Sequence, residues 1–414
     1  MTAETTYRVP TRSRGYSALA RLVPLSPTGF ASEHWGRQPL VSRANELLAG
    51  AADLLGRDDV DELVSRRGLR TPFLRVARDG RTLGDREFTA GGGVGAGIAD
   101  QVSDDKLLGH FAAGATIVLQ GLHRTWAPLI EFCQRLAEEL GHPAQANAYV
   151  TPRQNRGFDD HYDVHDVFVV QTSGEKRWRL RPPVRPAPLR DDPWTDHRAD
   201  VEEAASHEPL HEFTLSAGDV LYLPRGWIHS ATALGGVSTH VTIGVHVWTR
   251  RHLADELVAL ALDAASGAER VRGTLPLSPG GPRLASLTDD VEATRDALVV
   301  ALRSVPAVDV VRAFENRWRE TQRAAPVGPL AQVAAAEDLE GRSCVRLRPH
   351  LGARLGAEPG GGARLTSRLP DLTVEEHDVP ALIALVDDGV LRADMVGLDL
   401  TRRLLLAGLV VLED

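Results

Sequence analysis

The sequence predicts an α+β protein whose central part is an antiparallel β sandwich or barrel. Six short runs of β character fall between 146 and about 249, separated by Gly, Pro and Asp residues. Amphipathic helical patterns replace these runs after residue 250. The chain has 414 residues, of which 43% are hydrophobic and 25% are charged. We therefore expect two or three folded units of ordinary globular composition.

The residues before the β region predict helices and short extended segments. In order, these are a helix at 44–68, a hairpin turning at Asp79-Gly80, a glycine-rich surface loop at 90–97, and a buried strand at 115–122. The loop lacks the GK[ST] that a phosphate-binding loop requires. Thr125 is then expected to cap a helix that ends at Gly141. Within the β region, residues 181–210 are rich in Pro, Asp and Arg and are predicted to form a loop.

The residues after 250 predict a helical region followed by a small mixed unit. Helices are expected at 252–266 and 289–305, with 314–324 extending them. A stretch rich in Pro, Gly and Ala at 325–335 suggests a boundary. The short strands and helices of the last 80 residues would suit a winged-helix-like unit.

Charge and cysteine content exclude several classes of protein. The formal net charge of −9 is spread along the chain and disfavours clamping of a nucleic-acid backbone. Residues 336–414 carry 14 acidic and 9 basic side chains, so direct DNA binding by this part is not expected. Two cysteines exclude a disulfide framework and a cysteine-built zinc site. With no apolar run long enough for a membrane span, we expect a cytoplasmic protein.

Two segments of the β region carry candidate metal ligands. His161 and Asp163 alternate onto one face if they lie on a strand, about 7 Å apart along the backbone. The segment GDVLYLPRGWIHSA places His229 just after a tight turn. Two histidines and one carboxylate form the facial triad that is typical of non-haem Fe(II) oxygenases. His165 continues the alternation, so it is a further candidate as a ligand or as a hydrogen-bond donor to one.

These segments resemble a known family. The run NAYVTPRQNRGFDDHYDVHDVFVVQTSGEKRWRL, followed by GDVLYLPRGWIHSA, is similar to the JmjC-type cupin oxygenases of the ribosomal-oxygenase family. The resemblance is strong over 115–250 and weak elsewhere. Two departures are Ala233, where the cupin motif often has asparagine, and Asp160, where the family commonly has proline.

The resemblance implies a fold and an arrangement of domains. It implies a double-stranded β-helix (jelly-roll, cupin/JmjC) core at about 115–249 within a catalytic domain at 1–249. A helical dimerisation region at 250–325 and a winged-helix-like domain at 336–414 would follow. We therefore expect a homodimer.

The resemblance also implies site residues and cofactors. Fe(II) would be held by His161, Asp163 and His229, with 2-oxoglutarate and O2 as cosubstrates. Lys176 falls where the family places the basic partner of the distal carboxylate of 2-oxoglutarate, and it is one of only two lysines in the chain. The resemblance further implies that the cosubstrate or substrate pocket is lined by Asn147 and Tyr149, with Thr242 as another possible donor to that carboxylate.

Three functions remain open from the sequence. The first is hydroxylation of an Arg or His side chain of a ribosomal protein, as the resemblance implies. The second is the same chemistry on a peptide natural-product precursor. The third is a non-catalytic metal-binding cupin that carries an interaction module. Trp178, Trp227 and Trp248 are expected in the core under all three.

Overall fold

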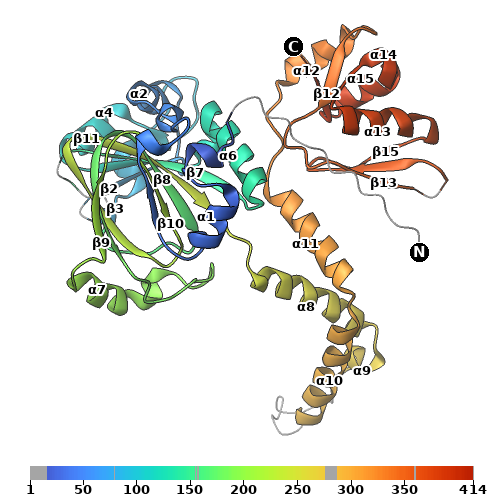
Figure 1. Ribbon diagram of the computed structural model, residues 1–414, viewed down its shortest axis with the longest axis horizontal. Coiled ribbons are helices and arrows are strands. Elements are labelled where there is room, and N and C mark those ends of the chain that lie inside the picture. The colour runs from blue at the N-terminus through green and yellow to red at the C-terminus, as the bar shows by residue number, and fades with distance from the viewer. Residues whose placement is uncertain are drawn as a thin grey trace. The chain divides into compact units, whose positions relative to one another are not determined.

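The computed structural model describes residues 16–78, 80–153, 155, 158–275, 287–358 and 360–413. The described residues divide into two compact units, one that ends at Val247 and one that begins at Trp248. Both units can be followed in Figure 1.

A largely antiparallel sheet forms the centre of the 10–247 unit (Figure 1). Its strands follow the order β1-β10-β8-β11-β7-β6-β2-β3. In addition, β9 pairs with residues 176–180 of β8, beyond the part of β8 that pairs with β10. The bounds are β1 (Leu40–Ser42), β2 (Leu74–Arg78), β3 (Arg81–Thr82), β6 (Thr116–Leu119), β7 (Ala144–Thr151), β8 (Asp166–Arg181), β9 (His211–Leu215), β10 (Val220–Leu223) and β11 (Ile228–Val245). The predicted antiparallel β structure is confirmed.

The two longest strands, β8 and β11, organise this sheet. They pair over nearly their whole lengths, with an irregularity where Leu234 and Thr239 of β11 face β8. Gly174 adopts a φ of +66° at this point, and a side chain there would collide with the backbone of Val237. The irregularity reverses which face alternate residues of β8 occupy, so that Val167 and Val169 share an inner apolar cluster with Trp178.

Helices and short turns surround the sheet. They are α1 (Pro27–Glu33), α2 (Arg57–Arg66), α3 (Asp85–Phe88), α4 (Asp104–Ala112), α5 (Leu122–Thr125), α6 (Ala127–Leu140) and α7 (Arg198–Ser206), with 3-10 turns at Leu19–Arg21, Ala44–Glu46, Ala52–Leu54 and Trp194–His197. A minor sheet pairs β4 (Thr89–Ala90) with β5 (Gln101–Val102). The main hydrophobic core contains Phe30, Phe132 and Phe168.

Four sequence predictions in this unit need correction. The helix expected at 44–68 is divided into two 3-10 turns and α2, because glycines interrupt it. Thr125 does not cap α6: it ends α5, and its hydroxyl donates to the Gly121 carbonyl. By contrast, the predicted hairpin needs no correction, because β2 pairs with β3, although Asp79 of its turn lies outside the described residues. The third correction concerns the loop predicted at 181–210, which contains α7, whose Val201 is fully buried. His161 forms only an isolated bridge, so 161–165 is not a strand.

The 248–414 unit begins with helices and continues as a mixed region. The elements are α8 (Arg250–Ser266), α9 (Glu269–Arg272), α10 (Thr288–Ser304), α11 (Ala307–Thr321), α12 (Pro329–Glu337), β12 (Cys344–Leu347), β13 (Arg354–Ala357), β14 (Ala363–Thr366), β15 (Leu372–Val374), a 3-10 turn at Glu376–Asp378, α13 (Val379–Asp388), β16 (Val390–Arg392), α14 (Ala393–Val396), α15 (Leu398–Leu406) and β17 (Val410–Leu412). They include two three-stranded sheets, β16-β12-β17 and β13-β14-β15. The expected boundary at 325–335 instead contains most of α12. No helix in the described parts of the chain is long and apolar enough to cross a membrane.

Candidate metal centre

Two histidines from distant segments are joined through their backbones. The N–H of His229 donates to the His161 carbonyl at 2.8 Å, and the N–H of His161 donates to the His229 carbonyl at 3.2 Å. Gly226, with φ +88°, makes the turn before β11, and its N–H donates to the Asp163 carbonyl at 2.9 Å. The two candidate ligand segments are therefore held together by three backbone hydrogen bonds.

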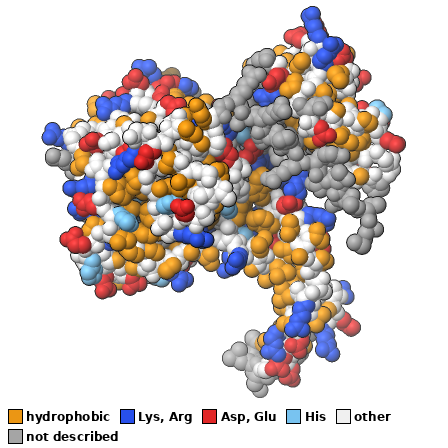
Figure 2. Space-filling model, in the orientation of Figure 1, with side chains coloured by type: hydrophobic (Ala, Val, Ile, Leu, Met, Phe, Trp, Pro, Cys, Tyr) orange, Lys and Arg blue, Asp and Glu red, His pale blue; other side chains and the backbone are white. Residues whose placement is uncertain are grey.

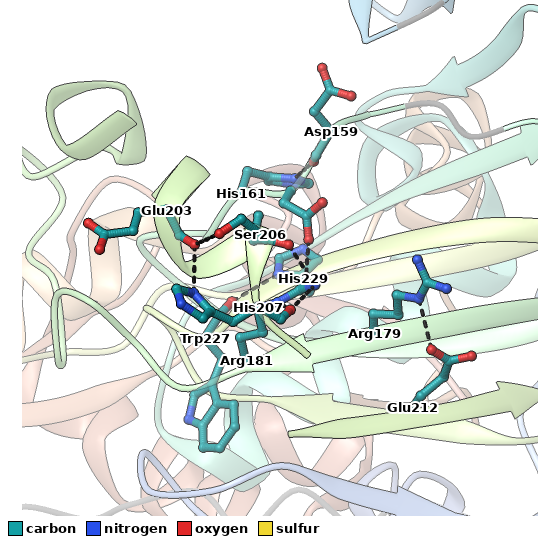
Figure 3. Close-up of polar contacts among 12 residues, drawn as sticks. Asp159, His161, Arg179, Arg181, Glu203, Ser206, His207, Glu212, Trp227 and His229 are labelled. Carbon is teal, nitrogen blue, oxygen red and sulfur yellow. Dashed lines mark hydrogen bonds and ion pairs between the residues drawn. The ribbon is translucent and has the colours of Figure 1, made fainter. Parts of the chain in front are cut away.

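Both imidazole rings are oriented by hydrogen bonds at Nδ1. The Nδ1 atom of His161 lies 2.7 Å from the Asp159 carbonyl, and that of His229 lies 3.0 Å from the Trp227 carbonyl. A carbonyl only accepts, so each Nδ1 carries the proton and each Nε2 keeps its lone pair. Figure 3 shows these two side chains together with Asp159 and Trp227. Metal-binding histidines are commonly fixed by such contacts.

Asp163 completes a compact donor set. One ligand atom from each of His161, Asp163 and His229 lies within 4.8 Å of the others, and Asp163 Oδ2 is 3.8 Å from His229 Nε2. Burial opposes ionisation of Asp163, but the nearby His165, His229 and His161 outweigh it and lower its pKa. Burial, followed by the charge of His161, lowers the pKa of His229 to about 4. Near neutral pH the set offers a carboxylate and a neutral imidazole, which fits a divalent transition metal.

His165 lies outside this donor set. Its ring stacks on His246 with a centroid distance of 5.1 Å and an interplanar angle of 12°. The predicted alternation of 161, 163 and 165 is interrupted because Val164 and His165 lie in a bend rather than on a strand. Burial, followed by the charge of His165, lowers the pKa of His246 to about 4. This pair therefore forms a separate stacked contact beside the triad.

The triad opens into a cavity that also contains Lys176. The cavity lining comprises Thr116, Tyr149, Phe158, His161, Asp163, Val167, Val169, Lys176, Trp178, His229, Ser230, Ala231, His240 and Thr242. Lys176 is only 4% exposed, and its Nζ lies 3.4 Å from Thr151 Oγ1 and 5.9 Å from the centre of the Trp178 ring. Burial lowers its pKa to about 7. Within the described residues Lys176 forms no ion pair with an acidic side chain, so an anionic group bound in the cavity would stabilise this buried cation.

The other predicted pocket residues separate into two groups. Tyr149 and Thr242 line the cavity. Burial and then the charge of Asp163 raise the pKa of Tyr149 to about 12, so its hydroxyl remains a donor. Asn147 is not among the lining residues, and its side-chain oxygen accepts a hydrogen bond from the Gly121 N–H at 3.0 Å. That contact connects β7 with the start of α5.

His240 and Trp178 also line the cavity, although no sequence pattern predicted them there. His240 is 3% exposed and its ring stacks on Tyr149 at 4.9 Å with an interplanar angle of 2°. Within the described structure, His240 Nδ1 and Trp178 Nε1 are buried without a hydrogen-bond partner. Burial, together with Lys176 and His229, lowers the pKa of His240 well below its ordinary value. Unpaired polar atoms beside a buried lysine are the signal that identifies them, and that signal needs a structure.

The comparisons with known proteins identify the domain that contains this site. Residues 123–253 match the family model of the JmjC domain. Ribosomal oxygenase 1 of Gallus gallus is 28% identical over 284 residues, which cover 67% of this chain and 45% of that protein. The "bifunctional lysine-specific demethylase and histidyl-hydroxylase NO66" of Drosophila persimilis is 25% identical over 280 residues, 65% of this chain and 36% of that protein. The chain thus spans less than half the length of these relatives.

Solved structures agree with the fold. The crystal structure of the Escherichia coli ribosomal oxygenase YcfD matches with a TM-score of 0.54 at 17% identity, covering 95% of this chain and 99% of that one. Another structure of YcfD, in complex with cobalt and 2-oxoglutarate, matches with a TM-score of 0.51 at 18% identity. These likenesses confirm the predicted JmjC cupin fold. Residues 123–253 therefore form a JmjC domain, and the proteins similar to this chain include ribosomal oxygenases.

Proposed function

We propose that this protein is an Fe(II)- and 2-oxoglutarate-dependent oxygenase that hydroxylates an Arg or His side chain of a ribosomal protein. The observation that carries the proposal is the joint presence, in one cavity, of the His161, Asp163 and His229 donor set and of the buried Lys176 without an acidic partner. Iron held there would use 2-oxoglutarate and O2 to oxidise a C–H bond, with succinate and CO2 as coproducts.

The residues of the chain would bind and orient the reactants. His161 and His229 present Nε2 because their Nδ1–H groups donate to carbonyls, and Asp163 supplies a negatively charged oxygen. Lys176 Nζ would bind the distal carboxylate of 2-oxoglutarate, with Thr242 and Tyr149 as further donors. An entering carboxylate favours the ammonium form, so it raises the pKa of Lys176 again. The apolar residues Val167 and Val169 would exclude water from the reacting groups.

The names of the relatives support a ribosomal substrate. Ribosomal oxygenases are named among the proteins similar to this chain, and NO66 is named as a histidyl-hydroxylase. A chain with a net charge of −9 would also attract a basic protein.

We assign catalysis to 1–249, dimerisation to 250–325 and a winged-helix-like module to 336–414, in a cytoplasmic protein.

The dimer proposal is supported by the surface of the helices. Hydrophobic side chains, orange in Figure 2, lie at the surface along α8 and α11. Exposed apolar residues include Val258, Leu262, Val300 and Val308, at 50–67% exposure. Leu253 of α8 and Val299 of α10 are also exposed, whereas Leu298 packs in a small cluster between α8 and α10.

Turnover on a ribosomal substrate tests the proposal. The purified protein would be incubated with Fe(II), 2-oxoglutarate and a set of intact ribosomal proteins, with Asp163→Ala as the control. We expect succinate formation and the mass of one added oxygen atom on an Arg or His residue. Turnover only with small peptide precursors would instead support the second function, and the absence of 2-oxoglutarate binding would support a non-catalytic cupin.

A further inference from the structure

Arg181, the last residue of β8, is a buried cation that joins three segments of the chain. Its side chain is 8% exposed, and Nη1 donates to Asp160 Oδ1 at 2.8 Å. Nη2 donates to the carbonyls of Ala205 at 2.9 Å and His207 at 3.0 Å, and Nε donates to the same His207 carbonyl at 3.2 Å. Figure 3 shows Arg181 and His207 on the side of the sheet near His229. The guanidinium therefore connects β8, the C-terminal end of α7 and the residue before His161.

The segment that carries His161 has little regular structure of its own. Among its described residues, 158–165, the strand-like pairing is limited to the single bridge between His161 and His229. Tyr162 is buried in a small cluster with Val201 of α7 and Ile228, and its hydroxyl donates to the Asp192 carbonyl at 3.0 Å. The ligand segment thus rests on the region 182–210, and Asp160 is its ionic attachment to that support.

An arginine suits this position because of its shape. The planar fork can reach a carboxylate and several carbonyls at once, whereas an ammonium would present a point charge. Carbonyls in the last turn of a helix lack partners within the helix, and Arg181 satisfies that of Ala205 in α7. Removal of Asp160 would leave the remaining contacts of Arg181 intact but would remove the ionic attachment of the ligand segment to β8 and α7.

We propose that Arg181 and Asp160 are positioning residues for the metal centre. By fixing the backbone before His161, the pair holds that imidazole at the distance from Asp163 and His229 that a metal ion requires. This inference rests on the proposed function, because it presupposes a metal at the triad. It goes beyond that function by assigning metal affinity to an ion pair that contributes no ligand.

Cobalt binding tests the pair without turnover. Co(II) would be titrated into apo-protein and followed by visible absorption, and the melting temperature of each apo-protein would be measured in parallel. The variants are Asp160→Ala, Arg181→Met and the double variant, with Asp160→Asn as the conservative change. We expect each of the first two to weaken Co(II) binding roughly 10- to 100-fold, the usual effect of removing a supporting contact behind a ligand. The double variant should be no weaker than the weaker single variant.

Arg179→Met provides the matched control. Arg179 lies two residues earlier on the same face of β8, and its Nε donates to Glu212 at 2.8 Å, a contact that is visible in Figure 3. It does not contact the ligand segment, so Co(II) affinity should not change. Asp160→Asn keeps an acceptor for Arg181 and should fall between wild type and Asp160→Ala. If Arg181→Met does not fold, the Co(II) affinity of Asp160→Ala decides whether the ion pair positions the metal ligands.

The outcomes separate the two proposals. Wild type that does not bind Co(II) would overturn the proposed function and with it this inference. Wild type that binds Co(II), with Asp160→Ala equally tight but lower in melting temperature, would leave the metal site standing and overturn the positioning role. An equal loss of affinity in Arg179→Met would also overturn it, because the effect would then be general to the arginines of this face.

Discussion

Replacing Lys176 with alanine should raise the KM for 2-oxoglutarate far more than it changes affinity for iron. The side chain is 4% exposed and has no acidic partner among the described residues, so its contact with a carboxylate would be shielded from water. Loss of a charge-assisted contact of this kind costs about 2–3 kcal/mol, which corresponds to roughly 30- to 150-fold in affinity. Lys176→Arg should retain more activity than alanine but less than wild type, because the planar fork must fit a cavity shaped for an ammonium.

The assay is succinate production against 2-oxoglutarate concentration, with iron saturating. Lys106→Ala is the matched control, since Lys106 is the only other lysine and its Nζ donates to the carbonyls of Thr89 and Arg86 rather than entering the cavity. Its KM should equal that of wild type. An unchanged KM in Lys176→Ala would refute the assignment of this residue as the carboxylate partner.

Three further predictions concern the ligands, pH and assembly. Alanine at His161, Asp163 or His229 should abolish iron-dependent turnover while circular dichroism shows a folded β unit, and turnover near the wild-type rate would remove that residue from the ligand set. Burial lowers the pKa of Lys176 to about 7, so in the ligand-free protein the Lys176 ammonium loses its proton as the pH rises above that value. Binding must then take up a proton, so the KM for 2-oxoglutarate should rise by up to about tenfold per pH unit, a rise that Lys176→Arg should lack; a flat KM in wild type would contradict this. Light scattering at micromolar concentration should show a dimer assembled through 250–325, and a monomer would reject that assignment.

Much of the candidate site could be predicted because its residues are marked by short motifs. His229 follows a glycine- and proline-containing turn, and His161 and Asp163 are two residues apart. The expected convergence of these three side chains is present. A strand was expected to align His161 and Asp163. Instead, backbone hydrogen bonds to His229 and Gly226 hold them, and Tyr162 between them packs in a small buried cluster.

The missed features depend on contacts between distant residues. α7 lies in a segment rich in Pro, Asp and Arg, and its burial comes from Val201 packing with Tyr162 and Ile228 rather than from a long apolar stripe. The contact between Arg181 and Asp160 spans 21 residues of sequence. No local pattern of charges distinguishes it from the neighbouring exposed arginines.

The most direct test of the account is the anaerobic addition of Fe(II) and 2-oxoglutarate to the purified protein. Chelation of iron by the keto-acid end of the cosubstrate at the triad predicts a weak visible absorption band that neither addition gives alone. Asp163→Ala should lack the band, and Lys176→Ala should require more 2-oxoglutarate to develop it. A folded wild-type protein that binds Fe(II) but shows no band at saturating 2-oxoglutarate would contradict the assignment of this cavity as a 2-oxoglutarate oxygenase site.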